Sequence, residues 1–233
     1  MNYIFDVDDT LTPSRYFMNE EFAAWFEPFA THNKCYWVTG SPKKMTKKQL
    51  GSVYNLAVRA YQCLGVDVWS GGTHVRSSNW SLPDDARQWL QEMCEKEDCS
   101  LKVENSKDCI HKRPGMVNYS IIGSTDDTNL RNAFSEWESW NGSRRRTADQ
   151  FNKEFPELQA TVGGRTGIDI GPRGYDKSKI LEDFDDITQI MFFGDKTFEG
   201  GNDYELAKAV RAGGGIVHAV EGWEETWKIL KKQ

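Results

Sequence analysis

Apolar residues alternate with amphipathic stretches at both ends of the chain. The apolar run at 3–7 is typical of a short buried strand, and residues 20–30 place apolar side chains at helical spacing. The same alternation predicts further strands at 34–38, 65–69, 189–193 and 215–220, and further helices at 44–60, 177–181, 202–212 and 221–232. Strands and helices in this order are typical of βαβ units, which build a parallel sheet.

The middle of the chain has a different pattern. It predicts helices at 83–97, 129–140 and 147–155, and strands at 101–103, 116–122 and 158–162. This mixture indicates an α+β domain inserted into the first one. We therefore predict an α/β protein with a parallel-sheet core at 1–75 and 171–233 and an inserted cap domain at 76–170. The three arginines at 144–146 are expected to form a solvated connection.

Composition narrows the class of protein. The chain has 233 residues, of which 38% are hydrophobic and 27% charged, so it can form a globular core. A net charge of −6 and a pI near 5.3 argue against broad nucleic-acid binding. The five cysteines include no CxxC pair, which favours reduced thiols over a zinc site or a disulfide framework. No apolar run reaches membrane-spanning length, so we expect a soluble, cytoplasmic protein with no membrane partner.

Two acidic residues follow the first predicted strand. Asp6 and Asp8 stand two positions apart, so in an extended backbone their side chains point to the same side. Close carboxylates repel each other, and a divalent cation relieves this repulsion and creates a site for phosphate. The alternative is a capped turn with solvated acids, but the strand before them and Thr10 after them favour a functional site.

Three more residues are candidates for phosphate chemistry. The hydroxyl of Thr39 could donate to a phosphate oxygen, although Thr39 could instead cap the helix that follows, and Ser41 is an equally good candidate. Lys177 could offset the charge of a carboxylate nucleophile and of phosphate, although taken alone it is better explained as a surface lysine.

The glycine-rich segment at 194–203 is the most specific stretch. Asp195 follows a predicted buried strand and would add an oxygen ligand for Mg²⁺, which prefers six oxygens. The alternative is a glycine-rich turn with a helix cap. Because open α/β sheets bind ligands beyond the carboxyl ends of their strands, Asp6, Asp8, Thr39 and Asp195 are expected to lie together.

Four segments resemble the eukaryotic-type phosphomannomutase family of the haloacid dehalogenase (HAD) superfamily. They are FDVDDTLT at 5–12, RPGMVN at 113–118, GGRTGID at 163–169 with GYDK at 174–177, and FFGDKTFEGGND at 192–203. The resemblance implies a HAD-like Rossmannoid core with a cap. It also implies a Mg²⁺-dependent enzyme that moves phosphate between carbon 1 and carbon 6 of a hexose phosphate through an aspartyl-phosphate. Family members form homodimers through the cap, and the need for a hexose 1,6-bisphosphate activator is left open.

The resemblance also implies roles for single residues. Asp6 corresponds to the nucleophile that accepts phosphate, and Asp8 to the general acid/base. Asp6, the carbonyl of Asp8 and Asp195 correspond to Mg²⁺ ligands, with Asn202 and Asp203 in support. The residues that correspond to substrate contacts are Arg15, Arg113, Arg131 and Asp169.

Three positions depart from the family pattern. Asp9 and Gly167 stand where the family has Gly and Ser, and Ser124 stands where it has a third cap arginine. These changes loosen the expected hold on the distal phosphate, so a sugar-phosphate phosphatase on the same site is the alternative. A catalytically silent sugar-phosphate binder is disfavoured by the complete set of Asp6, Asp8 and Asp195.

Overall fold

The computed structural model of the protein describes residues 1–102, 109–123 and 125–232. The chain divides into two compact units, which we call the first unit (Met1–Ser78 with Tyr175–Gln233) and the second unit (Asn79–Gly174). Each unit has its own sheet and its own apolar core. The roles of catalytic core and cap stay predictions for these two parts.

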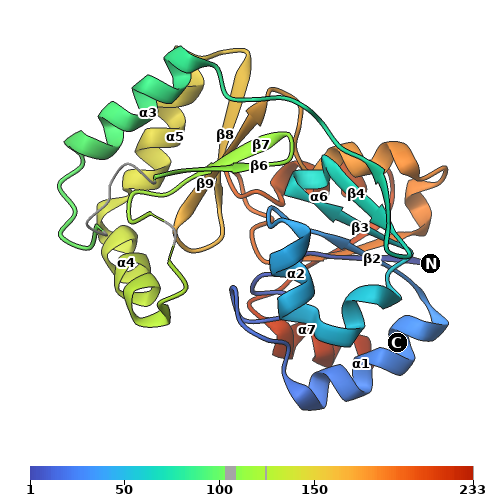
Figure 1. The fold of residues 1–233 in the computed structure, drawn as a ribbon. Helices are drawn as coiled ribbons and strands as arrows, with labels where there is room; N and C mark the ends of the chain where they lie inside the picture. The colour runs from blue at the N-terminus through green and yellow to red at the C-terminus, as the bar shows by residue number, and fades with distance from the viewer. Residues whose placement is uncertain (103–108, 124, 233) are drawn as a thin grey trace. The chain divides into compact units, whose positions relative to one another are not determined.

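The first unit is built on a seven-stranded sheet with the order β11-β10-β1-β2-β3-β4-β5 (Figure 1). Its strands are β1 (Asn2–Phe5), β2 (Lys34–Val38), β3 (Arg59–Gln62), β4 (Asp67–Ser70), β5 (Thr73–Arg76), β10 (Ile190–Gly194) and β11 (Ile216–Ala219). Its helices are α1 (Glu20–His32), α2 (Lys43–Leu50), α6 (Tyr204–Ala212) and α7 (Trp223–Leu230), with 3-10 helices η1 (Gly51–Leu56), η2 (Cys63–Gly65), η4 (Lys177–Asp183) and η5 (Ile187–Gln189). The strands from β11 to β3 pair in parallel, and β4 and β5 add an antiparallel hairpin. The α/β prediction is therefore confirmed.

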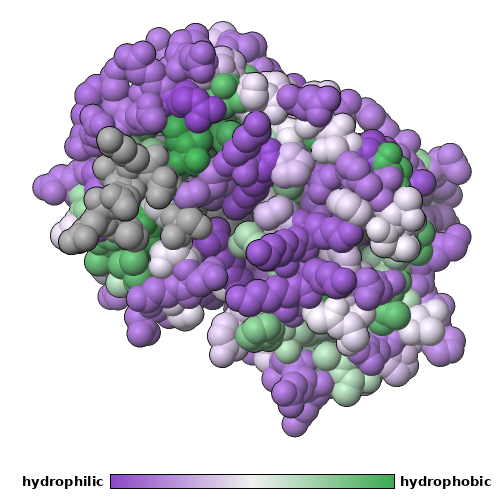
Figure 2. Space-filling model, in the orientation of Figure 1, coloured by the Kyte–Doolittle hydropathy of each residue, from purple (hydrophilic) through white to green (hydrophobic). Residues whose placement is uncertain are grey.

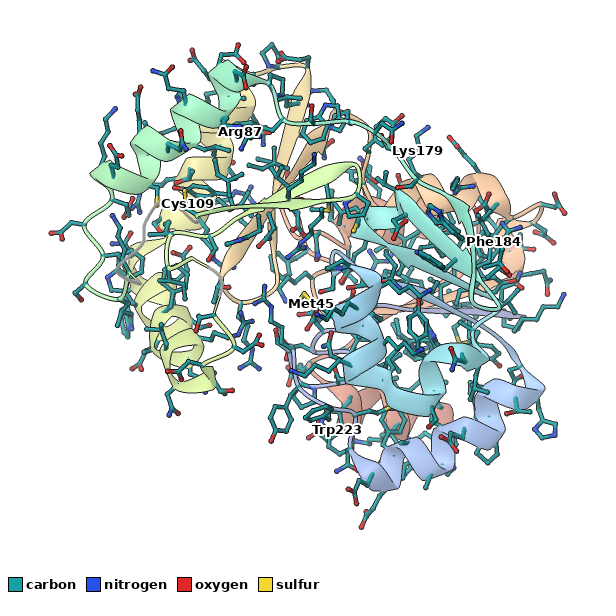
Figure 3. The ribbon with its side chains drawn as sticks, in the orientation of Figure 1. Met45, Arg87, Cys109, Lys179, Phe184 and Trp223 are labelled. Carbon is teal, nitrogen blue, oxygen red and sulfur yellow. The ribbon has the colours of Figure 1, made fainter. Side chains whose placement is uncertain are left out.

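Apolar side chains cover both faces of this sheet. Ile4 and Phe5 are neighbours on β1 and point to opposite faces, because side chains alternate along a strand. Phe5 belongs to a core with Phe22 of α1, whereas Ile4 belongs to a core with Leu206 of α6. Trp223 of α7, labelled in Figure 3, stacks on Phe22 with the ring centroids 5.8 Å apart. With both faces buried, the ends of the strands are where this sheet can present polar residues to a ligand.

The second unit has a four-stranded antiparallel sheet with the order β6-β7-β9-β8. Its elements are α3 (Asp84–Lys96), β6 (Ile110–Arg113), β7 (Met116–Tyr119), α4 (Thr128–Asn141), α5 (Ser143–Glu154), β8 (Leu158–Gly163) and β9 (Gly167–Pro172). One face of the sheet, with Val117 and Ile170, packs against the three helices in a single core. Asn118 and Asp169 alternate with these residues along β7 and β9 and therefore lie on the other face.

Some predicted elements of the first unit are wrong at their boundaries. The helix predicted at 44–60 ends at Leu50, because Gly51 takes a φ of 56° and breaks the helix. The chain then continues as η1 and as β3, a strand that the sequence did not predict. The strand predicted at 65–69 is β4, shifted to Asp67–Ser70, and the segment at 177–181 begins a 3-10 helix.

The second unit also differs from its prediction. Strands β6 and β9 were not predicted, since glycine at both ends of the Gly167–Gly171 stretch hides the β pattern of β9. Leu101 and Lys102 are not in a strand, and Val103 lies outside the described residues. The connection expected at 144–146 is wrong, because these arginines lie in the first turn of α5. Arg145 and Arg146 are exposed as expected, but the side chain of Arg144 is only 12% exposed.

The surface agrees with the amphipathic pattern of the helices. The face of the molecule in Figure 2 is largely hydrophilic, and apolar colour is confined to separate patches. This is expected because the apolar sides of the helices face the cores. Within the described part of the chain, no helix is both long enough and apolar enough to span a membrane.

Candidate active site

The carboxyl ends of adjacent parallel strands bring predicted site residues together. β1 lies between β10 and β2 in the sheet. Asp6 follows β1, Asp195 follows β10 and Thr39 follows β2. The peptide nitrogen of Asp6 also donates to the carbonyl of Phe193 (2.9 Å), which extends the pairing of β1 with β10 as far as Asp6. The first unit therefore gathers these residues at one edge of its sheet.

Lys177 is fully buried between two carboxylates. Its Nζ donates to Oδ1 of Asp6 (2.6 Å) and to Oδ1 of Asp203 (2.7 Å), and its side chain is 0% exposed. Burial by itself disfavours the ammonium group, but Asp203 and Asp6 outweigh burial, so the pKa of Lys177 is raised and the side chain is charged. The surface lysine that we held as the alternative is therefore wrong, and Lys177 sits beside the predicted nucleophile.

The loop after β10 is closed by reciprocal contacts between its two ends. The peptide nitrogen of Lys196 donates to Oδ2 of Asp203 (3.1 Å), and the peptide nitrogen of Asp203 donates to the carbonyl of Lys196 (3.2 Å). A Cβ atom at Gly201 would lie 2.2 Å from the same carbonyl oxygen, so only glycine fits there. This close approach explains the glycine-rich sequence of the segment and fixes Asp203 near Lys177.

Three carboxylates in this region could hold a cation. Asp6, Asp195 and Asp203 each offer an oxygen, and these oxygens all lie within 4.8 Å of one another. Burial raises the pKa of Asp195 to about 6, although the ammonium of Lys196, which contacts the Asp195 carboxylate, works against this shift. Burial likewise raises the pKa of Asp6 well above its usual value, with Lys177 opposing it. These carboxylates are thus costly to keep ionised without positive charge.

The side-chain oxygen of Asn202 is a further candidate ligand for a cation. Its Oδ1 atom is buried and has no hydrogen-bond partner among the described residues. A buried amide oxygen without a partner is unusual, because nearly all buried polar atoms in proteins are hydrogen-bonded. Together with the three carboxylates, this oxygen fits a small, hard divalent cation, which takes oxygen ligands.

Asp8 is not one of the three clustered carboxylates, and its side chain is held by other groups. Its Oδ1 accepts from the peptide nitrogen of Arg15 (2.7 Å) and from Nε2 of Gln49 (3.0 Å). The hydroxyl of Ser41 donates to its Oδ2 (3.4 Å). The side chain of Asp8 is thereby oriented without a metal, which leaves its carbonyl as its predicted contribution to the metal site.

Thr39 and Ser41 differ in what they do. The hydroxyl of Thr39 accepts from the peptide nitrogen of Ser41 (3.0 Å), so it closes the turn after β2. The capping alternative is wrong, because α2 begins after Pro42 and has no side-chain cap. The hydroxyl of Ser41 instead points to Asp8. Both side chains are buried, at 1% and 6% exposed. Of the two, Ser41 has the direct link to a predicted catalytic residue.

The turn after the first strand contains two residues in the left-handed region. Asp9 has a φ of 56° and Arg15 a φ of 58°. Asp tolerates this conformation better than most residues, and the Oδ1 atom of Asp9 accepts from the peptide nitrogen of Ser14 (3.1 Å). The turn therefore survives the replacement of glycine by Asp9, at the cost of one more negative charge near Asp8.

The second unit holds the other predicted substrate residues in two buried groups. Asp169 accepts at Oδ1 from Nδ2 of Asn118 (2.7 Å) and from Nη1 of Arg113 (3.5 Å). Arg131, which is 5% exposed, donates from Nη1 to the hydroxyl of Thr166 (3.2 Å). The structure thus brings Arg113 to Asp169. Ser124, the third departure, lies outside the described residues.

Comparison with known proteins gives the family of the chain. Residues 38–233 match the family described as eukaryotic phosphomannomutase. The phosphomannomutase of Saccharomyces cerevisiae is 32% identical over 97% of this chain and 91% of that protein. This chain belongs to the eukaryotic phosphomannomutase family. The phosphomannomutase of Galdieria sulphuraria is 31% identical, again over 97% of this chain and 91% of that protein.

Solved structures show the fold of this phosphomannomutase-family chain. A HAD subclass IIB sugar phosphatase superposes with a TM-score of 0.61 and 18% identity, over 99% of this chain and 98% of that chain. An IMP-nucleotidase of Plasmodium falciparum gives a TM-score of 0.62 and 13% identity, over 99% of this chain and 67% of that one. At such identities the likeness concerns the fold alone. The predicted HAD-like fold class and the family resemblance are confirmed.

Two residues of this phosphomannomutase-family chain have structural roles that the sequence did not predict. Gln49 donates a hydrogen bond to Asp8, but it does not follow a strand, so its position in the sequence does not indicate a site residue. Arg144 donates from Nη1 to the carbonyls of Gly163 (3.4 Å), Gly164 (3.2 Å) and Gly167 (3.4 Å), and so fastens the β8–β9 turn. The signal that could have found Arg144 is Glu138, an acid six positions earlier that pairs with it (3.5 Å).

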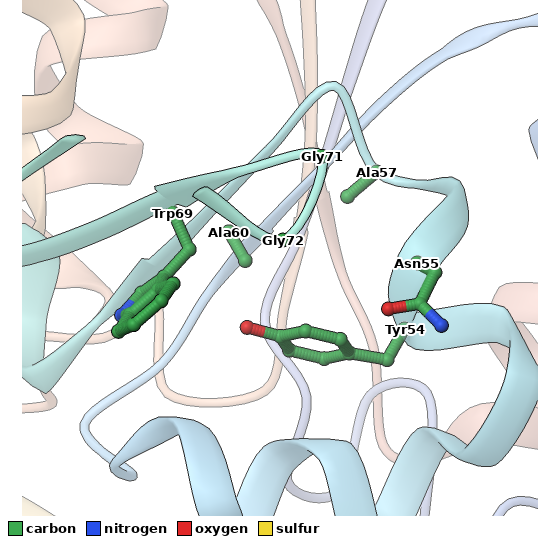
Figure 4. A pocket seen from close by; sticks show the side chains of 7 residues that line it. All are labelled: Tyr54, Asn55, Ala57, Ala60, Trp69, Gly71 and Gly72. Atoms are coloured by element: carbon green, nitrogen blue, oxygen red, sulfur yellow. The ribbon is translucent and has the colours of Figure 1, made fainter. Parts of the chain in front are cut away.

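A small cavity lies beside the β4–β5 hairpin in the first unit (Figure 4). It is lined by Tyr54, Asn55, Ala57, Ala60, Trp69, Gly71 and Gly72. Its volume of about 10 Å³ is close to the smallest space that holds one water molecule. We therefore assign no substrate to this cavity.

Proposed function

We propose that this protein is a Mg²⁺-dependent phosphomannomutase-like phosphotransferase that moves phosphate between carbon 1 and carbon 6 of a hexose phosphate. The observation that carries the proposal is the buried cluster of Asp6, Asp195 and Asp203 with Lys177, in a chain of the phosphomannomutase family. Phosphoryl transfer depends mainly on positioning and on neutralising charge, and this cluster is suited to both.

In the proposed reaction, Asp6 is the nucleophile and Asp8 is the general acid/base. Asp6 attacks phosphorus, the bond between phosphorus and the sugar oxygen breaks, and Asp8 gives a proton to that oxygen. The free hydroxyl of a hexose monophosphate then attacks the phosphoryl group on Asp6 and gives its proton to Asp8, which forms a hexose 1,6-bisphosphate. Transfer of the other phosphate of this bisphosphate to Asp6 releases the isomeric monophosphate and restores the phosphorylated Asp6. The contacts from Gln49 and Ser41 support this role, because they hold the Asp8 carboxylate in one orientation.

Positive charge supports the transfer from two sources. Lys177 stays beside Asp6 throughout, because its second bond to Asp203 does not involve the nucleophile. Asp6, the carbonyl of Asp8 and Asp195 would hold Mg²⁺, with Asn202 and Asp203 in support. Bound Mg²⁺ supplies charge that stabilises the transferring phosphoryl group.

Substrate recognition is proposed for four further residues. Arg113 and Arg131 supply guanidinium groups for a second phosphate, since a planar fork matches phosphate oxygens. Asp169 contacts a sugar hydroxyl, and Arg15, next to the loop of Asp8, contacts the substrate in the first unit. Mannose is the proposed sugar and a hexose 1,6-bisphosphate the proposed activator, both by analogy with the family.

A sugar-phosphate phosphatase is the second candidate. It is favoured by Asp9, whose left-handed turn places one more negative charge beside the predicted site, and by Gly167, which carries no side chain to hold substrate. In that reaction water, rather than a second sugar hydroxyl, attacks the phosphoryl group on Asp6. A silent binder stays disfavoured, because the acid cluster and its buried lysine are complete.

Phosphorus NMR tests the two enzyme candidates directly. The protein is mixed with Mg²⁺ and mannose 1-phosphate, with and without a trace of a hexose 1,6-bisphosphate. Growth of a 6-phosphate signal without inorganic phosphate supports the mutase, whereas release of inorganic phosphate alone supports the phosphatase. No change in either sample would contradict both.

The variant Asp6→Ala tests the proposed nucleophile. It should abolish turnover while the circular dichroism spectrum stays that of the wild type. Asp185→Ala is a matched control, since Asp185 is an exposed carboxylate of the same unit. Retained turnover in Asp6→Ala would reject the nucleophile and both enzyme mechanisms.

Assembly and location are also proposals. We propose a homodimer formed through the second unit, as in the family, and light scattering after size-exclusion chromatography would measure its mass. A monomer at micromolar concentration would contradict it. The cytoplasmic location expected from the sequence stays a prediction that cell fractionation would test.

A further inference from the structure

Gly167 of β9 and Asn118 of β7 compete for one space in the second unit. A Cβ atom at Gly167 would lie 2.4 Å from Nδ2 and 2.9 Å from Oδ1 of Asn118, closer than real Cβ contacts. Gly167 is not in the left-handed region, so the constraint is space rather than backbone conformation. Asn118 thus fills the place that a side chain at 167 would take.

In that place Asn118 holds one oxygen of Asp169. Its Nδ2 donates to Oδ1 of Asp169 (2.7 Å), and Nη1 of Arg113 approaches the same oxygen (3.5 Å). Asn118 and Asp169 are 5% and 3% exposed, so both are fixed inside the unit. Among the described residues, these two donors to Asp169 both use Oδ1, which leaves Oδ2 to accept from a ligand.

The strand that carries Gly167 is held on two sides. Gly167 pairs with Gly163 of β8, and the carbonyl of Gly167 accepts from Nη1 of Arg144 (3.4 Å). Arg144 is itself paired with Glu138 (3.5 Å). A side chain added at 167 would therefore displace Asn118 rather than the strand, and the bond from Asn118 to Asp169 would break.

We propose that Asn118 is a positioning residue of the substrate site, and that the absence of a side chain at 167 is the condition for this role. Asn118 orients the Asp169 carboxylate so that Oδ2 accepts a hydrogen bond from a hydroxyl of a hexose phosphate. The inference rests on the proposed function, in which Asp169 contacts the sugar.

Four variants test the pairing with mannose 1-phosphate as the substrate. Asn118→Ala and Gly167→Ser should each raise KM about tenfold, the effect expected when one hydrogen bond to a charged group is lost, with kcat changed less than about twofold. In Asn118→Ala with Gly167→Ser, the new hydroxyl has the vacated space and can donate to Asp169, so KM should return towards the wild-type value. Gly171→Ser is the matched control on the same strand, because a Cβ atom there would be 3.8 Å from its nearest neighbour, and it should leave KM unchanged.

The proposal would be overturned if the increases in KM of the two single variants multiplied in the double variant. It would also be overturned if the single variants had the wild-type KM. If the wild type turns over no hexose phosphate, the proposed function fails, and the pair is then judged from urea unfolding of the same proteins. In that measurement the midpoint losses of the single variants should not add in the double variant, and additive losses would overturn the pairing itself.

Discussion

Replacement of Lys177 by Met would remove a buried charge while keeping a side chain of similar shape. Lys177 is 0% exposed and lies 2.6 Å from Asp6 and 2.7 Å from Asp203. Removing one partner of a buried ion pair costs about 3–5 kcal/mol, because the remaining charge is left without compensation. For a chain of this size each kcal/mol lowers the unfolding midpoint by about 2–4 °C, so Lys177→Met should unfold about 6–20 °C below the wild type.

Magnesium should restore part of this loss. A cation held by Asp6, Asp195 and Asp203 would replace the missing positive charge, and a ligand at a hundred times its Kd stabilises the folded state by about 2.7 kcal/mol. The midpoint should therefore rise more with Mg²⁺ in Lys177→Met than in the wild type. Differential scanning fluorimetry across a Mg²⁺ titration measures both shifts.

The matched control is Lys179→Met, which removes a lysine that is 44% exposed and pairs with Glu182. It should change the midpoint far less than Lys177→Met does, since solvent screens an exposed pair and such pairs contribute little to stability. A wild-type midpoint in Lys177→Met would refute the assignment of Lys177 as the charge partner of the cluster. If Mg²⁺ raised the unfolding midpoint equally in Lys177→Met and in the wild type, the cation and the Lys177 ammonium would not share a site.

Three further substitutions have defined outcomes. Asp9→Gly should lower KM for the sugar phosphate about threefold in steady-state kinetics, because it removes a negative charge near the predicted site, and an unchanged KM would contradict this reason. Arg144→Gln should lower the free energy of unfolding in urea by about 3 kcal/mol, since it removes the positive charge beside the buried Glu138, which keeps only its hydrogen bonds from Ser143 and a peptide nitrogen. A loss no larger than that of Arg145→Gln, an exposed control, would count against this reason. Burial opposes the shift, but Arg76, Tyr61 and Arg59 together outweigh burial and lower the pKa of Asp183. The stability from these contacts is therefore present above the unfolded-state pKa of about 3.9 and is lost as the pH falls through the folded-state value. Asp183→Asn should therefore cost about 1 kcal/mol at neutral pH and progressively less in acid, and a cost that is independent of pH would reject the ion pair as its cause.

The strand-end acids could be predicted because their position follows from topology. Parallel strands present their carboxyl ends at one edge, so Asp6 and Asp195 had to meet once β1 and β10 were neighbours. Lys177 was a candidate from its charge alone, with a surface lysine as the better explanation. Its burial could not be foreseen, since η4 is irregular and its register depends on the packing of Ile180.

The second unit was harder to foresee because its important contacts join distant segments. Asn118 and Asp169 pair across β7 and β9, and β9 was not predicted from its glycine-rich sequence. Arg144 belongs to a run of three arginines, and Glu138 is its one signal in the sequence. Its bonds to three backbone carbonyls become visible only in the folded turn. A local sequence pattern indicates whether a side chain is buried or exposed. The roles of Asn118 and Arg144 depend instead on segments that are distant in the sequence and that only the fold brings near.

All five cysteine thiols are buried, and each unit has its own set. Cys35 and Cys63 lie in the first unit, and Cys94, Cys99 and Cys109, the last labelled in Figure 3, lie in the second. Burial also raises the pKa of Cys35 to about 12, so this thiol hardly reacts in the folded protein. The rate at which a thiol reagent alkylates each cysteine, measured by peptide mass spectrometry, would therefore report the local unfolding of each unit separately. Ligands of the two units could then be told apart by which cysteines they protect from alkylation.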